Sequence, residues 1–125
     1  MANNFKVTTV ASVATTVGAN TAKIYTCPGS TTMIVLALML TNKHTSSIDT
    51  SVVLSSNTDN PAHNDNNNSG NNADVFVIKD VTIDEQSSLE IMAGQKYVLE
   101  DSDELKVYAD NANIDVTLSY MEITA

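Results

Sequence analysis

Short runs of apolar and β-branched residues, separated by polar turns, make up most of the chain. Val, Ile, Thr and Tyr dominate these runs, and no long stretch repeats its apolar residues at helical spacing. The pattern predicts strands over residues 22–27, 31–40, 48–54, 74–79, 87–92, 96–100, 104–109 and 114–123. It therefore indicates an all-β chain, and we expect no α-helix.

The last predicted strand shows the alternation most clearly. Ile114, Val116, Leu118 and Tyr120 alternate with polar residues, which is typical of a strand with one buried face. Met121 breaks this alternation because it is apolar in a polar position. We therefore expect either a β-bulge near Tyr120–Met121 or a strand end that is buried on both faces.

Turn residues separate the predicted strands. Cys27-Pro28-Gly29-Ser30 is a strong turn signal between the strands over 22–27 and 31–40. Acidic turn residues separate 96–100 from 104–109, so these two strands read as a hairpin.

Strands at this spacing predict a single-domain antiparallel β-sandwich, jelly-roll-like, with about eight strands. The 125 residues are an ordinary length for one domain, so we assign 1–125 to one unit. Residues 1–20 fit either another strand or an extended N-terminal arm. A sandwich, a jelly roll and a small barrel share these sequence signals, so the strand topology stays open.

An Asn-rich stretch, residues 57–72, stands apart because it holds almost no apolar side chains. We expect a long surface loop, since such a stretch cannot bury enough surface to offset its ordering entropy. Asp65, Asn67 and Ser69 alternate as oxygen ligands do in the first half of a calcium loop. The second half is missing, because Phe76 stands where the bidentate Glu is required. We therefore favour a loop without an ion and keep these three residues as a partial cation motif.

The run from Met33 to Leu40 is apolar without alternation, so both faces of this strand need cover. A loop or the N-terminal arm of the same chain would supply that cover, and so would a neighbouring subunit. The interface residues we predict come from this run and from the N-terminal arm: Met33, Ile34, Val35, Leu36, Leu38, Phe5 and Val7.

The charge balance excludes whole classes of partner. The net charge is −9, and all six basic residues are lysines. Nucleic-acid binding needs clustered Lys and Arg, as does docking on anionic lipid, so we expect neither nucleic acid nor membrane as a partner. The longest apolar run is too short for a membrane helix, and the polar start does not resemble a signal peptide, so we expect synthesis in a cytoplasm.

Side chains capable of chemistry are scattered over predicted turns and loops. They are the histidines His44 and His63, the turn carboxylates Asp84, Glu85, Asp101, Asp103 and Glu104, and the single cysteine Cys27. None of them shows the ligand spacing of a metal site, and the chain lacks the Gly-x-Ser-x-Gly elbow of a hydrolase. The sequence therefore predicts no enzyme and no cofactor.

Two ordered series of segments carry a family resemblance. The front series is Tyr25-Thr26-Cys27-Pro28-Gly29-Ser30-Thr31-Thr32 followed by 34–42. The back series is 77–80, 87–90, 94–100, 103–107 and 115–124. Together they resemble small virion structural proteins of tailed bacteriophages, particularly myophages of marine cyanobacteria. The resemblance covers about residues 22–55 and 73–125; Asp84-Glu85-Gln86 and Ser102-Asp103 depart from the family's usual turns, and 57–72 looks like an insertion.

The resemblance implies a virion structural protein without catalytic residues. The form it favours is a capsid decoration (cement) protein, which stabilises the head shell through contacts between subunits. It implies a homo-oligomer, with the trimer as a common form, and contacts with virion proteins such as the major capsid protein. A tail, neck or fibre-associated protein stays open as an alternative, as does a glycan-binding host-recognition module. Sugar-binding modules stack sugars on exposed aromatic rings, however, and this chain has no Trp.

Overall fold

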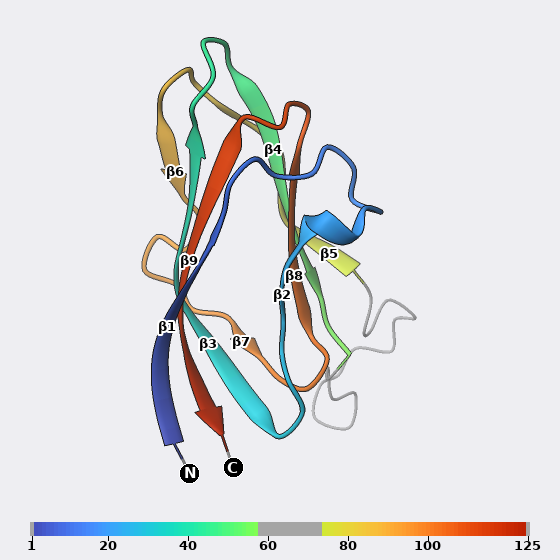
Figure 1. Ribbon diagram of the computed structural model, residues 1–125, viewed down its shortest axis with the longest axis vertical. Coiled ribbons are helices and arrows are strands. Elements are labelled where there is room, and N and C mark those ends of the chain that lie inside the picture. Colours follow the sequence, from blue (N-terminus) through green and yellow to red (C-terminus); the bar gives the residue numbers. More distant parts are fainter. Residues whose placement is uncertain (1, 58–73, 125) are drawn as a thin grey trace.

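The computed structural model describes residues 2–57 and 74–124, and most of them lie in β-strands (Figure 1). The strands are β1 (Ala2–Val10), β2 (Lys23–Thr26), β3 (Thr31–Asn42), β4 (Ile48–Ser55), β5 (Asp74–Ile83), β6 (Ser88–Glu90), β7 (Val98–Leu99), β8 (Glu104–Ala109) and β9 (Ile114–Thr124). The helical content of these residues is one 3-10 turn, η1 (Asn20–Ala22). The all-β prediction is confirmed.

Two antiparallel sheets pack face to face. Sheet A has the order β1-β9-β3-β6, with β7 also paired with β3, and sheet B has the order β2-β8-β4-β5. Because β6 and β7 pair with different parts of β3, they act as one interrupted strand. With these two counted as one, successive strands alternate between the sheets, except that β4 and β5 both lie in sheet B. This is the double Greek key of a jelly roll, so the predicted sandwich is confirmed and its topology is now defined.

The core lies between the sheets and follows from the alternation along each strand. On β9, Ile114, Val116, Leu118 and Tyr120 point inward and are buried. Sheet B supplies the facing apolar side chains, among them Ile48, Val52, Leu105 and Val107. Burial of these two inner faces is the main stabilising term of the fold.

The irregularity of sheet A lies in β3 and not in β9. The register of β9 with β1 is unbroken through Tyr120 and Met121, so the bulge predicted there is wrong. The pairing of β3 with β9 shifts between Val35 and Ala37, which leaves Leu36 as the extra residue, 38% exposed. The other alternative, a strand end buried on both faces, is met only on the inner face, where Glu122 is buried, because Met121 on the outer face is half-buried.

The predicted hairpin of 96–100 with 104–109 is wrong. β7 pairs with β3 in sheet A, whereas β8 pairs with β2 and β4 in sheet B. The turn between them therefore carries the chain from one sheet to the other. The local pattern of strand, turn and strand is the same in both arrangements, so it does not distinguish a hairpin from a crossing.

Three residues of the predicted interface belong to the core. Met33, Val35 and Leu38 are buried on the inner face of β3, where they pack inside the chain. The cover that they need is therefore internal, and we correct the prediction by removing them from the interface. On the same strand, Ile34 and Leu36 remain at least partly accessible.

The N-terminal segment is a strand of the sandwich. β1 pairs with β9 over its whole length, and the chain then crosses through the buried Val13 and η1 to β2. Of the predicted loop 57–72, the structure describes Asn57, whose backbone N–H donates to Asp103 Oδ1 at 2.6 Å. The rest of that loop lies outside the described residues.

Truncation of Leu118 should test the inner packing. Leu118 is buried at the centre of the core, so Leu118→Ala should lower the free energy of unfolding by roughly 2–5 kcal/mol. The matched control, Leu36→Ala, removes the same atoms from the partly exposed bulge and should cost less than half as much. Urea unfolding followed by circular dichroism measures both, and equal losses would contradict the assignment of inner and outer faces.

Candidate functional site

The predicted chemical residues are not gathered into one site. Asp65, Asn67, Ser69 and His63 lie outside the described residues. His44 lies in the β3–β4 connection, where its backbone N–H donates to Asn42 Oδ1 at 2.8 Å. Within residues 2–57 and 74–124, no three His, Cys, Asp or Glu side chains come together as a metal site would require.

The two predicted carboxylate clusters lie at opposite ends of the sandwich (Figure 1). Asp84 and Glu85 are exposed in the β5–β6 turn. Asp103, by contrast, is buried, and its carboxylate accepts the backbone N–H groups of Glu100 and Asn57. It therefore holds the turn that crosses between the sheets, a role that the sequence analysis did not assign.

Cys27 is a buried structural residue. Its thiol donates weak hydrogen bonds to the carbonyl oxygens of Thr31 and Leu99, at 3.4 and 3.6 Å. Burial raises the pKa of the Cys27 thiol, which therefore stays protonated at neutral pH and is a poor nucleophile.

A polar cluster that the sequence analysis missed lies at the seam between β1 and β2. We call it the seam cluster: Lys6, Thr8, Tyr25, Tyr120 and Glu122. Glu122 Oε1 accepts a charged hydrogen bond from Lys6 Nζ at 2.7 Å, and Oε2 accepts one from the Tyr25 hydroxyl at 2.7 Å. The Tyr120 ring packs against Tyr25 in a tilted arrangement with centroids 5.0 Å apart, and its hydroxyl lies 3.3 Å from Thr8 Oγ1.

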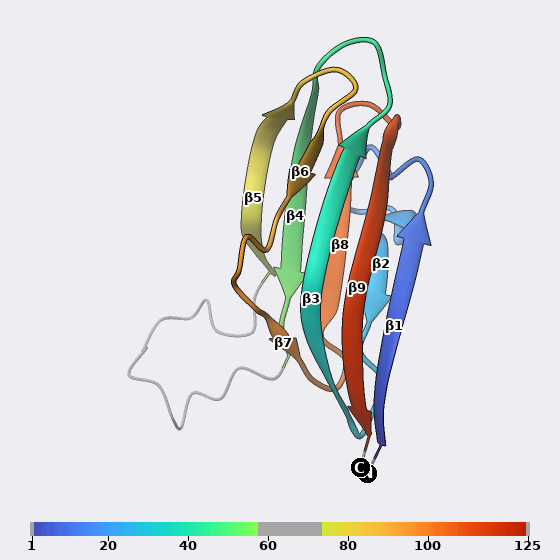
Figure 2. The same ribbon diagram turned by 90° about the vertical axis from the view of Figure 1, so that its left-hand side faces the viewer.

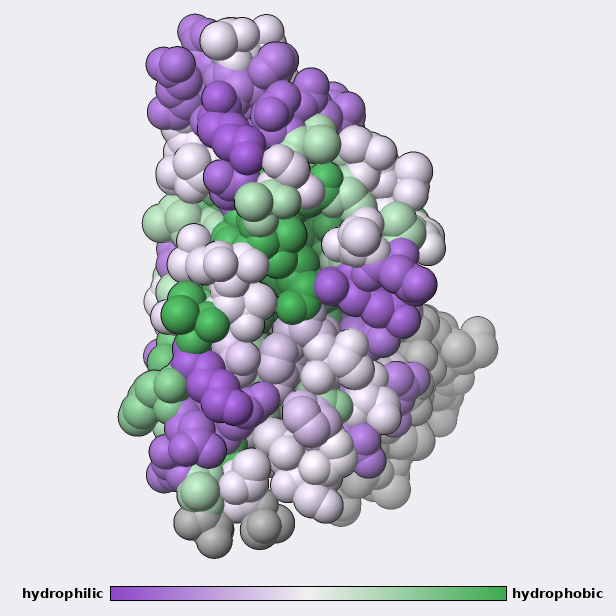
Figure 3. Space-filling view, in the orientation of Figure 1, coloured by the Kyte–Doolittle hydropathy of each residue, from purple (hydrophilic) through white to green (hydrophobic). Residues whose placement is uncertain are grey.

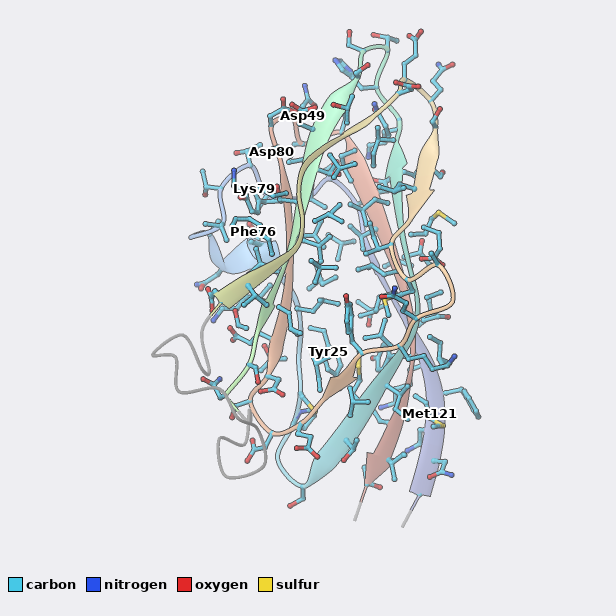
Figure 4. The ribbon with its side chains drawn as sticks, turned by 180° about the vertical axis from the view of Figure 1, so that it is seen from behind. Tyr25, Asp49, Phe76, Lys79, Asp80 and Met121 are labelled. Atoms are coloured by element: carbon cyan, nitrogen blue, oxygen red, sulfur yellow. The ribbon has the colours of Figure 1, made fainter. Side chains whose placement is uncertain are left out.

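The seam cluster ties three strands together. Lys6 comes from β1, Glu122 from β9 and Tyr25 from β2, so one carboxylate joins the edge strand of sheet A to sheet B. Figure 4 shows Tyr25 reaching into the space between the sheets. Figure 3 views the molecule from the side where this seam lies. Hydrophobic residues are seen at its centre, and hydrophilic residues cover its upper end.

Hydrogen bonding sets the charges of the seam cluster. The bonds from Lys6 and then Tyr25 hold the pKa of the Glu122 carboxyl below its ordinary value, and the same contact raises the pKa of Lys6. Burial, and then the bond to Glu122, raises the pKa of Tyr25. At neutral pH the cluster thus pairs an ionised Glu122 with a charged Lys6 and a neutral Tyr25. It positions strands and holds no activated nucleophile.

The outer face of sheet A carries an apolar row, which we call the outer row: Phe5, Met121, Ile34 and Val98. Register places Phe5 opposite Met121, Met121 opposite Ile34, and Ile34 opposite Val98. Directly opposed residues point to the same face, so the row crosses β1, β9, β3 and β7. Phe5 is 74% exposed and Val98 56% exposed. In Figure 2 this face is toward the viewer, and no other described element crosses in front of β1, β9 and β3.

A smaller exposed group lies on β5, at the edge of sheet B (Figure 4). Lys79 Nζ lies 5.5 Å from the centre of the exposed Phe76 ring and 2.8 Å from Asp80 Oδ2. The bond from Lys79 holds the pKa of Asp80 below its ordinary value. The lysine thus occupies the position over this aromatic ring where a stacking ligand would sit.

Comparisons of the chain with protein-family models, with curated proteins and with solved structures found no match. Among the described residues, no helix has the length and apolar character needed to cross a membrane.

Replacement of Glu122 by glutamine should lower stability more at neutral than at acid pH. A carboxylate with a lowered folded-state pKa contributes stability above its unfolded-state pKa of about 4.3, and this is lost as pH falls through the folded-state pKa. The difference in Tm between wild type and Glu122→Gln should therefore be largest near pH ~7 and shrink below pH ~4. Thermal unfolding across this range measures it, and a constant difference would contradict the assigned charge state.

A matched pair of tyrosine variants isolates the hydrogen bond. Tyr25→Phe removes one donor to the Glu122 carboxylate and should cost roughly 1–3 kcal/mol. Tyr97→Phe removes the hydroxyl of a half-buried tyrosine outside the seam cluster and should cost less.

Proposed function

We propose that this protein is a structural component of a tailed-bacteriophage particle, in the form of a capsid decoration protein that binds its neighbours through the outer face of sheet A. The observation that carries the assembly part of this proposal is the outer row. The phage part rests on the sequence resemblance.

The outer row is unusual for the outside of a sandwich. An antiparallel sheet with one wet face normally presents polar side chains outward. Here apolar side chains from β1, β9, β3 and β7 lie in one line, and the exposed Val7 and Leu36 flank it. Contiguous exposed apolar side chains of this kind mark protein–protein contact surfaces.

The charge distribution on β1 and β9 also favours this face as a contact surface. The chain carries −9, yet the charged residues of β1 and β9 are Lys6, Asp115 and Glu122, and each is in an ion pair. Lys43 is the partner of Asp115, at 2.8 Å. This part of sheet A therefore adds no net charge, so a partner docks there without uncompensated repulsion.

The function that follows is mechanical. The jelly roll is one of the folds used by viral capsid domains, which supports a role in a particle, although the fold also serves lectins and enzymes. Packaged DNA pushes a head shell outward, and a clamp across the seams between capsomers raises the free energy needed to open them. An interface of standard size, ~1,600 Å², buries enough apolar surface for such a clamp.

Antibody-gold labelling of purified particles tests the location. Gold spread over the heads is the expected result for a decoration protein. Gold confined to the neck, tail or fibres would replace decoration by the tail-associated alternative. No gold anywhere, with the antibody detecting the denatured protein in the same particles by blot, would contradict an exposed decoration.

Val98→Lys should test the outer row directly. The substitution places a charge in the exposed end of the row, so it should reduce co-sedimentation with particles that lack the protein by at least tenfold. The matched control is Val75→Lys, which changes an equally accessible valine, 51% exposed, on the edge of sheet B. Equal binding of wild type and Val98→Lys would contradict the outer row as the contact surface.

A further inference from the structure

The two sheets have four edges, and three of them are blunted within the described residues. β2 is four residues long and its register with β8 shifts between Lys23 and Tyr25. β5 has two register shifts against β4, and Asp80 takes a φ of 51°. The edge of sheet A opposite β1 is split into the two short strands β6 and β7. Ala93 and Gly94 lie between them with positive φ angles. Short length and irregularity of this kind prevent a sheet edge from pairing with another chain.

β1 is the exception among the four edges. It is nine residues long and pairs with β9 in an unbroken register. It contains no Pro or Gly, and its one charged side chain, Lys6, is engaged with Glu122. Its outward-facing Phe5 and Val7 are 74% and 61% exposed, the highest values among the large apolar side chains described. Lys6 points inward to Glu122, so the outer side of this long and regular edge presents Phe5 and Val7 and forms a template for another strand.

We propose that the free edge of β1 pairs with the same edge of a second copy of this chain, antiparallel about a two-fold axis, so that the two A sheets form one continuous sheet. This inference deepens the proposed function, on which it rests for its biological setting, by naming one partner and its contact.

The edge is complementary to itself. Antiparallel pairing about a two-fold axis is an isologous contact, in which one patch meets its own copy. Phe5 and Val7 of both copies then lie on the same outer face, because residues of the same parity face each other. Phe5 is also the end of the outer row at β1, so the row continues into the second copy.

The charge distribution permits a second copy at this edge. Two chains of −9 repel each other, and the repulsion is weakest where neither brings net charge to the contact. β1 meets this condition, since Lys6 and Glu122 neutralise each other. A pair centred on Lys6 would place the two lysines opposite each other, so the axis is expected at Phe5 or Val7.

The oligomeric state of the isolated protein tests the proposal. We expect light scattering after size exclusion to give a dimer for wild type and a monomer for Val7→Lys at the same concentration. Val75→Lys is the matched control on sheet B and Val98→Lys the control on the outer row away from β1, and both should stay dimeric. Circular dichroism checks that all four proteins are folded.

A cysteine trap supplies an independent readout. Val7→Cys or Phe5→Cys should form an intermolecular disulfide, whichever lies at the axis, because directly opposed strand residues have the Cα separation of a disulfide. Val75→Cys should not, and the native Cys27 is buried.

Three results would overturn the proposal: a monomeric wild type at every concentration, a dimeric Val7→Lys, or loss of the dimer in Val75→Lys as well. None of these bears on particle labelling or on the Val98→Lys binding assay. A failure of β1 pairing is therefore distinguishable from a failure of the proposed function.

Discussion

The pairing of β3 with β9 is the interaction on which the rest of the jelly roll depends. β1 joins sheet A through β9, and β6 and β7 join it through β3, so every strand of this sheet is attached to that pair. Leu38 and Leu118 lie opposite each other in the ladder and are both buried against sheet B. A slip of one residue would turn the whole inward set to solvent, so the core determines the register. The same register determines which apolar side chains of β9 face outward, beginning with Met121.

The bulge at Leu36 explains why one strand is apolar on both faces. The extra residue resets the alternation of β3, so that Val35 and Leu38 both face the core although they are three positions apart. Glu90 stabilises this irregularity, because its carboxylate accepts the backbone N–H of Leu38 at 2.9 Å. The inward residues of the run build the core, and Ile34 on the other face joins the outer row. The apolar run of β3 therefore contributes side chains both to the core and to the outer face of sheet A.

The parts of the fold that could be predicted from the sequence are those with a local signal. The alternation of β9 and the turn at 27–30 each depend on a few neighbouring residues, so the sequence predicts both. It does not predict the partner of β7, because a hairpin and a crossing between sheets begin with the same residues. The seam cluster has no local signal either, since Lys6 lies 116 positions from Glu122 and Tyr25 lies 97 positions from it. Among the apolar residues of β3, only the pairing distinguishes the buried Met33 from the accessible Ile34, which is why the predicted interface mixed the two.

The seam cluster links the stability of the fold to the surface that we propose for assembly. β1 has no fully buried side chain, so apolar burial alone holds this strand weakly. Glu122 compensates for that by joining Lys6 of β1 to Tyr25 of β2, which fixes the edge strand against both sheets. A strand that is already ordered loses less conformational entropy when it binds than a flexible arm does. Exposed Phe5 and Val7 therefore lie on an edge strand that Glu122 ties to both sheets, and this buried carboxylate supports the association that we propose without contacting the partner.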